Sequence, residues 1–203
     1  MKKHPAIAVV EFGDIPAGMS ATDAMLKKAP IAFVKCGTIT HGRYLTLIGG
    51  SMASVDEALR EGLAFGGECV LDHLLLADVH PRVYEAILGR RKPGASGALA
   101  IVETDTVAAS VRAAEAALKG TPVDLIEIRL ADAGLSGKGV SVYQGDLSDI
   151  QAAVDIVDQY VQKVGVELRH RIISAPHEGL IRQIETSTWF GSQTVLDLDG
   201  EVV

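Results

Sequence analysis

The stretch Ala-Ile-Ala-Val-Val-Glu at residues 6–11 returns as Ala-Leu-Ala-Ile-Val-Glu at residues 98–103. Laid over one another without a gap, residues 6–31 and 98–123 share ten identical residues in 26 positions. Self-similarity at a fixed spacing is the sequence signature of repeated structural units. The chain therefore contains one unit written twice in tandem.

The repeat continues beyond the first match, after three additional residues in the second copy. Gly42 then aligns with Gly137, and the same spacing pairs Gly50 with Gly145, Ala58 with Ala153 and Pro81 with Pro176. We therefore expect both halves of the chain to fold alike along their whole length.

A short helix is predicted after the first strand of each copy. The segments around residues 20–28 and 109–119 are rich in Ala, with Leu and Lys near their ends. Each stops before a proline, Pro30 or Pro122, because a proline disfavours helical backbone angles in the residue ahead of it.

Two more strands, a longer helix and a closing strand complete each copy. The predicted strands are residues 31–39, 44–49 and 69–77 in the first copy and 123–130, 139–143 and 166–173 in the second. Ser51 and Asp146, both N-cap residue types, precede the longer helix. The order βαββαβ is that of the ferredoxin-like motif. We predict an α+β chain of two tandem ferredoxin-like domains.

Glycine, proline and charge mark the boundary between the copies. We predict a first domain at residues 1–89, a linker at 90–97, a second domain at 98–186 and a C-terminal tail at 187–203. Arg90-Arg91-Lys92 is interpreted as part of a solvated linker. The tail holds the only tryptophan, Trp189, and we expect it to fold back on the body.

The composition excludes several classes of protein. A net charge of −7 disfavours a nucleic-acid binder, which clusters Lys and Arg against phosphates. No run approaches the roughly 18 apolar residues of a membrane span. Two cysteines, Cys36 and Cys69, are too few for a disulfide framework. We expect a protein of the reducing cytoplasm that binds neither nucleic acid nor membrane.

A search for catalytic chemistry yields little. Glu11 and Glu103 recur at the end of the first strand, where a carboxylate is more often satisfied by backbone N–H groups than catalytic. The sequence has no phosphate-binding glycine loop, nucleophile elbow or zinc-binding helix motif. Cys36 is interpreted as a buried small hydrophobe, with a redox or metal role as the alternative. We predict that the protein is not an enzyme.

Several segments, in order and in both copies, match a known family. They are Met19-Ser-Ala-Thr-Asp-Ala-Met-Leu-Lys-Lys-Ala, Gly42-Arg-Tyr-Leu-Thr-Leu-Ile-Gly-Gly, Leu75-Leu-Ala-Asp-Val-His-Pro and Ile173-Ser-Ala-Pro-His-Glu. The chain resembles the tandem-domain, trimer-forming shell proteins of bacterial microcompartments, and among them the propanediol-utilisation branch. This resemblance covers nearly the whole chain except the linker and the tail.

The resemblance implies a structural protein that forms a pseudohexameric homotrimer. Such trimers tile with other shell proteins, hexamers and pentamers, into a microcompartment shell in the cytoplasm. A central pore would pass small metabolites, and the pore-lining residues would be Thr38, Ile39, Thr40, His41 and Gly42 with Asp132, Ala133, Gly134, Leu135, Ser136 and Gly137. The tile-edge residues would be Lys27, Lys119 and His80, the last at the place of the family's edge arginine.

The resemblance also bears on cofactors and selectivity. Some family members carry an iron–sulfur cluster on a loop cysteine, but Thr40 stands at that position and Cys36 lies four residues upstream. We therefore expect no iron–sulfur cluster and no other cofactor, with Cys36 the single candidate metal ligand. We hypothesise that His41 and Asp132 bias which polar or anionic metabolites cross the pore.

Two other functions are consistent with a ferredoxin-like oligomer. One is a trimeric small-molecule-binding or sensor protein, with clefts between subunits that bind a metabolite. The other is an enzyme with an inter-subunit active site, for which the sequence lacks paired titratable residues.

Overall fold

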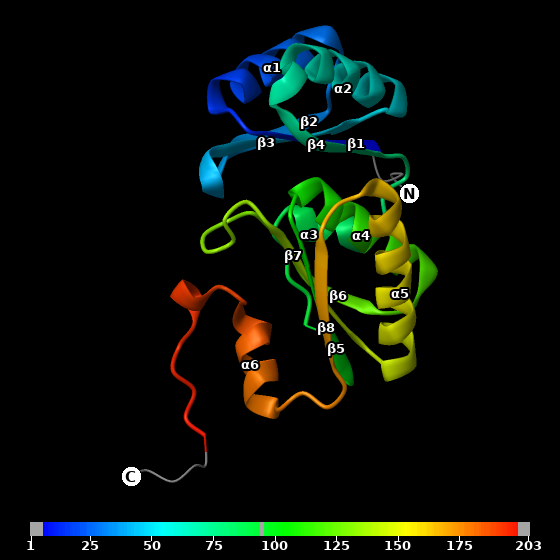
Figure 1. Ribbon diagram of the computed structural model, residues 1–203, viewed down its shortest axis with the longest axis vertical. Helices are drawn as coiled ribbons and strands as arrows, with labels where there is room; N and C mark the ends of the chain where they lie inside the picture. The colour runs from blue at the N-terminus through cyan, green and yellow to red at the C-terminus, as the bar shows by residue number, and fades with distance from the viewer. Residues whose placement is uncertain (1–5, 94–95, 199–203) are drawn as a thin grey trace.

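The computed structural model describes residues 6–93 and 96–198. It contains two units, each with one four-stranded antiparallel sheet, in the orders β2-β3-β1-β4 and β6-β7-β5-β8 (Figure 1). This is the antiparallel arrangement of the ferredoxin-like motif. The predicted α+β fold of two tandem units is confirmed. Residues 94–95 of the predicted linker and 199–203 of the predicted tail lie outside the described residues.

The two units repeat the same order of strands and helices. The first contains β1 (Ala6–Phe12), α1 (Ile15–Lys28), β2 (Phe33–Ile39), β3 (Arg43–Gly50), α2 (Met52–Gly66), β4 (Val70–Leu76) and α3 (Pro81–Ile87). The second contains β5 (Ala98–Thr104), α4 (Val107–Gly120), β6 (Asp124–Leu130), β7 (Gly139–Gly145), α5 (Leu147–Val164), β8 (Leu168–Ile173) and α6 (Glu178–Thr186).

The first helix of each unit begins earlier than its apolar pattern predicts, because a capping residue sets its start. Asp14 Oδ1 accepts the Ala17 N–H at 2.7 Å, and Thr106 Oγ1 accepts the Ala109 N–H at 3.2 Å. Such caps satisfy N–H groups that have no partner inside the helix. Asp14 and Thr106 therefore occupy equivalent places in the two units.

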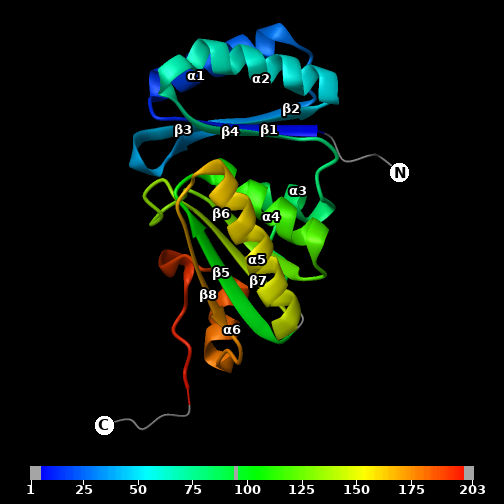
Figure 2. The same ribbon diagram turned by 45° about the vertical axis from the view of Figure 1, so that its right-hand side comes forward.

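The two central strands of the first sheet, β1 and β3, are buried on both faces. The side chains of Ala8 and Val10 pack toward α1 and α2, as alternation along a strand requires. Their neighbours Ile7 and Val9 point the other way and share a core with Val107 and other residues of α4 and α3. In Figure 2 this second layer lies directly beneath the first sheet. The contact between the two units therefore contains a continuous apolar core.

The second sheet is buried on one face and only partly covered on the other. Its inner face packs against α4 and α5. On its outer face, Leu99 and Val142 pack against Ile184 of α6, whereas Ile101 and Glu103 are partly exposed. The two sheets thus differ in what covers their outer faces.

The predicted pairing of Pro81 with Pro176 is wrong. Glu11 lies opposite Asp72 in the first sheet, and Glu103 lies opposite Arg169 in the second. Equivalent residues of the closing strands β4 and β8 are therefore 97 positions apart in sequence, two more than the 95 that pairs Pro81 with Pro176. The second unit has additional residues between β7 and β8. Arg169 is the structural equivalent of Asp72.

The linker is also more ordered than predicted. The Lys92 N–H donates to the carbonyl oxygen of Ile126 at 3.0 Å, and Arg91 pairs with the buried side chain of Glu127. The segment before residue 94 therefore lies along β6 instead of being a solvated linker. The start of the tail contacts the body through Thr188, whose Oγ1 donates to Glu127 at 2.5 Å, whereas Val195 is 94% exposed, so only this part of the tail folds back as expected.

Candidate functional site

The loops that follow β2 and β6 lie side by side (Figure 1). The N–H and the Oγ1 of Thr40 both donate to the carbonyl oxygen of Ala131, at 3.0 and 2.6 Å. The Gly137 N–H donates to Thr40 Oγ1 at 2.9 Å. One hydroxyl therefore joins the two loops that the sequence predicts to line a pore.

Most of the predicted pore residues lie in these two loops. Thr38 and Ile39 instead end β2, and Thr40–Gly42 form a 3-10 turn. In the second loop, Leu135 is half-buried and Gly137 is buried, whereas the exposed residues are Asp132, Ala133, Gly134 and Ser136. The exposed residues next to Thr40 are His41 and Gly42.

Both loops contain left-handed backbone. The φ angle is 68° at His41, 52° at Ala131 and 49° at Ser136. This conformation costs a residue with a Cβ more than it costs glycine. The hydrogen bonds of Thr40 offset part of this cost and hold the loops in one arrangement.

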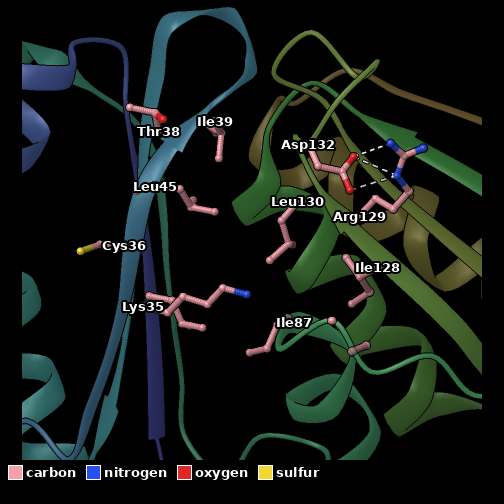
Figure 3. Close-up of a pocket in the computed structure, with 14 residues that line it drawn as sticks. Lys35, Cys36, Thr38, Ile39, Leu45, Ile87, Ile128, Arg129, Leu130 and Asp132 are labelled. Atoms are coloured by element: carbon pink, nitrogen blue, oxygen red, sulfur yellow. Dashed lines mark hydrogen bonds and ion pairs between the residues drawn. The ribbon is translucent and has the colours of Figure 1, made fainter. Parts of the chain in front are cut away.

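Asp132, one of the two residues proposed to tune the pore, is paired with a cation. The Nε of Arg129 lies 2.9 Å from Asp132 Oδ1, and its Nη2 donates to the carbonyl oxygen of Ala133 at 2.6 Å (Figure 3). Sequence analysis missed Arg129. The charge that the second loop presents is therefore that of an ion pair and not of an isolated carboxylate.

Replacing Thr40 with valine tests the link between the loops. Valine keeps the shape but removes the hydroxyl, so Gly137 N–H loses its acceptor and protein stability should fall by about 1–2 kcal/mol. Hydrogen exchange should show faster exchange of the Gly137 amide. Thr38→Val, at an exposed position near the end of β2, should leave that amide unchanged. Equal exchange in both variants would contradict the assignment.

A cavity of about 380 Å³ lies between the two units, beside these loops. Leu45 and Leu47 of the first sheet, Ile87 of α3 and Ile128 of β6 line it, and Lys35 reaches into it from the edge strand (Figure 3). Its charged lining residues are limited to Lys35, Arg129 and Asp132. This mostly apolar wall does not bring a general acid and a general base together.

The interpretation of Cys36 as a buried residue is wrong, because Cys36 is exposed on the edge strand β2. Its side chain points away from the cavity in Figure 3. Cys36 lies opposite Thr46 in the sheet. Its contact with the hydroxyl of Tyr44, together with burial, raises the pKa of Tyr44 to about 12.

Glu11 anchors the contact between the units. Its side chain is 0% exposed; Oε1 accepts from Arg43 Nη1 at 2.6 Å and Oε2 accepts the Val107 N–H at the start of α4 at 2.8 Å. Burial raises the pKa of Glu11, and the hydrogen bonds from Arg43 and Val107 oppose that shift. The prediction that this carboxylate is satisfied by backbone N–H is confirmed for Glu11.

Arg82 anchors α3, which ends the first unit in sequence but packs against β6 and α4 of the second. Its Nε donates to the Leu125 carbonyl at 2.7 Å, Nη2 to the Ile126 carbonyl at 2.6 Å and Nη1 to the Arg90 carbonyl at 2.9 Å. The carbonyls of Leu125 and Ile126 lie at an irregularity in the pairing of β6. Sequence analysis missed Arg82 and Arg43.

The three predicted tile-edge residues have different surroundings. Lys27 has a side chain 75% exposed and pairs with Asp23 on its own helix. Lys119 is half-exposed and donates to the Asp78 carbonyl at 3.2 Å, across the contact between units. His80 caps α3, because its Nδ1 accepts the N–H two residues later. Lys27 is the most exposed of the three.

Residues 6–93 and 96–198 contain neither a candidate metal site nor a candidate membrane-spanning helix. No three side chains of His, Cys, Asp or Glu gather there in a way that could hold a metal ion. None of the helices described has both the length and the apolar character needed to cross a bilayer.

Comparison with known sequences gives matches over most of the chain. The model of the BMC domain family matches twice, at residues 6–82 and 98–176. The bacterial microcompartment shell protein PduT of Citrobacter freundii is 35% identical over 179 residues, 88% of this chain and 97% of that protein. The carboxysome assembly protein CcmO of Synechococcus elongatus is 25% identical over 190 residues, 87% of this chain and 67% of that protein.

Solved structures give the same result. A microcompartment protein from Desulfitobacterium hafniense superposes with a TM-score of 0.76 at 32% identity, over 88% of this chain and 99% of that one. A double-ringed trimeric shell protein of the RMM microcompartment has a TM-score of 0.57 at 18% identity, over 77% and 82% of the two chains. The second likeness concerns the fold alone.

Proposed function

The chain belongs to the BMC domain family and is a structural shell protein of a bacterial microcompartment, not an enzyme; from this premise we propose that three copies close into a pseudohexameric ring with a central pore. Six similar units, two from each chain, would form the ring. The tile would act in the cytoplasm.

One observation supports this proposal most strongly. Within the chain, the first sheet packs on α4, whereas the second sheet and α1 keep the two matching surfaces exposed. The outer face of the first sheet packs on α4, where Val111 is 0% exposed. The equivalent residue of α1, Met19, is 52% exposed, and the outer face of the second sheet keeps Ile101 partly exposed. A contact between unlike surfaces builds a ring when its rotation closes. These two open surfaces support closure between chains.

The paired loops support the position of the pore. Thr40 joins the loop of the first unit to that of the second, so repetition around a threefold axis would alternate the two loops. They differ in length and content, which favours an opening of threefold character. His41 and the Arg129–Asp132 pair would then each occur three times near the axis.

We further propose that the tile packs against other shell proteins, hexamers and pentamers, through Lys27 and Lys119. The Lys27→Ala/Lys119→Ala double variant should leave trimers intact but lower the amount of sheets and tubes by about tenfold, as a loss of about 1.4 kcal/mol per contact would. Electron microscopy of the overexpressed protein measures this. Lys28→Ala, whose side chain instead pairs with Glu61, is the matched control. Undiminished sheets in the double variant would refute the edge role.

The pore hypothesis predicts a change of selectivity when His41 becomes alanine. Removing three imidazoles from the opening should change the passage of anionic metabolites by about threefold or more, while leaving stability within about 0.5 kcal/mol, because His41 is exposed. Solute flux into reconstituted shells measures this. Unchanged flux of both anionic and neutral solutes would show that His41 does not tune the pore.

We also propose that the chain holds no iron–sulfur cluster. A cluster on the axis needs thiolates that converge there. Thr40 occupies the loop position, and its hydroxyl is already bonded to the second loop. Cys36 belongs to the strand, with its side chain directed away from the cavity. The residues present therefore do not fit such a group.

A further inference from the structure

The outer face of the second sheet carries a groove of about 510 Å³. Ile101 and Glu103 of β5 line it together with Leu168, Arg169 and Arg171 of β8. The matching face of the first sheet is filled by α4 of the same chain. We call the packing of α4 on the first sheet the filled contact. Because the two sheets are equivalent, the filled contact indicates what kind of helix the groove can bind.

In the filled contact, β4 meets the start of α4 through polar groups. Thr106 Oγ1 donates to Asp72 Oδ2 at 2.5 Å, and Arg112 lies 3.9 Å from the same carboxylate. The repeat places Asp14 where Thr106 stands, since both cap their helices, and Ser20 where Arg112 stands. An acidic strand position thus meets a neutral cap and a cation.

At the equivalent position of the second sheet the charge is reversed. Arg169 replaces Asp72 on the face that also holds Glu103. The α1 helix offers a carboxylate, Asp14, in place of the hydroxyl of Thr106, and it lacks the cation of α4. Between the two copies, the strand position changes from acidic to basic and the helix changes from basic to acidic. Such a matched change is what residues in contact would show.

We propose that the groove receives α1 of a second copy of this chain, with Arg169 pairing with Asp14, and that this pair fixes the order of units around the ring. This rests on the proposed trimer. If the internal contact of a chain opened, its first sheet could take α1 of another copy and its second sheet could take α4. That wrong order would put Asp72 against Asp14 and Arg169 against Arg112. Like charges facing each other across an interface suppress wrong partners.

Two carboxylates, Glu103 and Glu167, and two further cations, Lys138 and Arg171, lie in or beside the groove. Arg169 lies 2.9 Å from Glu167 and 3.9 Å from Glu103, and Glu103 lies 2.6 Å from Lys138. Glu103 and Glu167 would face the positive end of the α1 dipole. Glu103, 34% exposed, would accept the Ile15 N–H as its equivalent Glu11 accepts that of Val107.

The proposal is tested by replacing Arg169 and Asp14 with the residues that stand at the equivalent positions of the filled contact, Asp72 and Thr106. Arg169→Asp installs the residue of the first sheet and should raise the concentration of half-dissociation of the trimer about 100-fold. Adding Asp14→Thr recreates the Asp72–Thr106 pair with a helix cap retained, and should bring that concentration back to within about tenfold of the unchanged protein. Sedimentation velocity over a dilution series measures both. Arg60→Asp, on the exposed face of α2, is the control.

Each outcome is decisive. An unaffected trimer in Arg169→Asp, or a double variant no better than the single one, overturns the order code while leaving the trimer standing. An unchanged protein that is itself not a trimer overturns the proposed function instead. If circular dichroism shows Arg169→Asp to be unfolded, Arg169→Gln removes the charge without reversing it and should weaken the trimer about tenfold; no weakening contradicts the pair.

Discussion

Replacing Glu11 with alanine is expected to lower the free energy of unfolding by about 3–5 kcal/mol, because breaking a buried ion pair leaves the other charge without its partner. Arg43 would lose its carboxylate, and the Val107 N–H at the start of α4 would lose its acceptor. Both groups lie at the contact between the units. The loss should therefore affect the two units together.

Urea unfolding at one fixed protein concentration measures this change. Glu57→Ala, an exposed carboxylate on α2, should change stability by no more than about 0.5 kcal/mol. A Glu11→Ala protein as stable as the control would mean that the carboxylate does not hold the units together. Glu11→Gln should fall between the two, since it keeps an acceptor for Val107 but loses the charge.

Replacing Arg82 with alanine is expected to cost about 3 kcal/mol. Three hydrogen bonds to carbonyl oxygens would be lost, two of them to Leu125 and Ile126 where the β6 pairing is irregular. Arg82 is almost fully buried, so water would not replace these donors fully. Thermal and urea unfolding measure the loss.

Lysine should not rescue Arg82. A single ammonium lacks the planar fork that reaches carbonyls in several directions, so Arg82→Lys should recover less than half of the loss. Arg60→Ala, at an exposed arginine paired within α2, should be near neutral. Full rescue by lysine would show that charge, and not the fork, is what α3 needs.

The fold could be predicted because the repeat lies in its strands. The runs at residues 6–11 and 98–103 are apolar at nearly every position, and the structure buries β1 on both faces and most of β5. Strands buried on both faces read as continuous apolar runs. The two matching runs therefore predict a duplicated core from the sequence alone.

The different surroundings of equivalent residues could not be predicted. Glu11 and Glu103 occupy the same place in the repeat, yet one is buried and the other one-third exposed. The difference arises because the first sheet is covered by a later part of the chain, whereas the second sheet has no third unit to cover it. Sequence identity between the two copies predicts their shared fold, but it does not predict which part of the chain packs against each copy.

Arg82 and Thr40 show a second limit of the sequence. Their partners are backbone carbonyl and N–H groups of the other unit. Nearly every residue carries such groups, so the sequence contains no partner residue type from which these contacts could be predicted. The pairing of Arg129 with Asp132 had a weak signal, since the two stand three residues apart with opposite charge. The exposure of Cys36 follows from its edge strand, a position that depends on sheet order.

The mass of the purified protein in solution tests the central claim most directly. Sedimentation equilibrium at micromolar concentration should give three times the chain mass of 21.4 kDa, because the open face of the second sheet and the open face of α1 are satisfied when three chains close a ring. A monomer, or a dimer that persists on dilution and concentration, would contradict it.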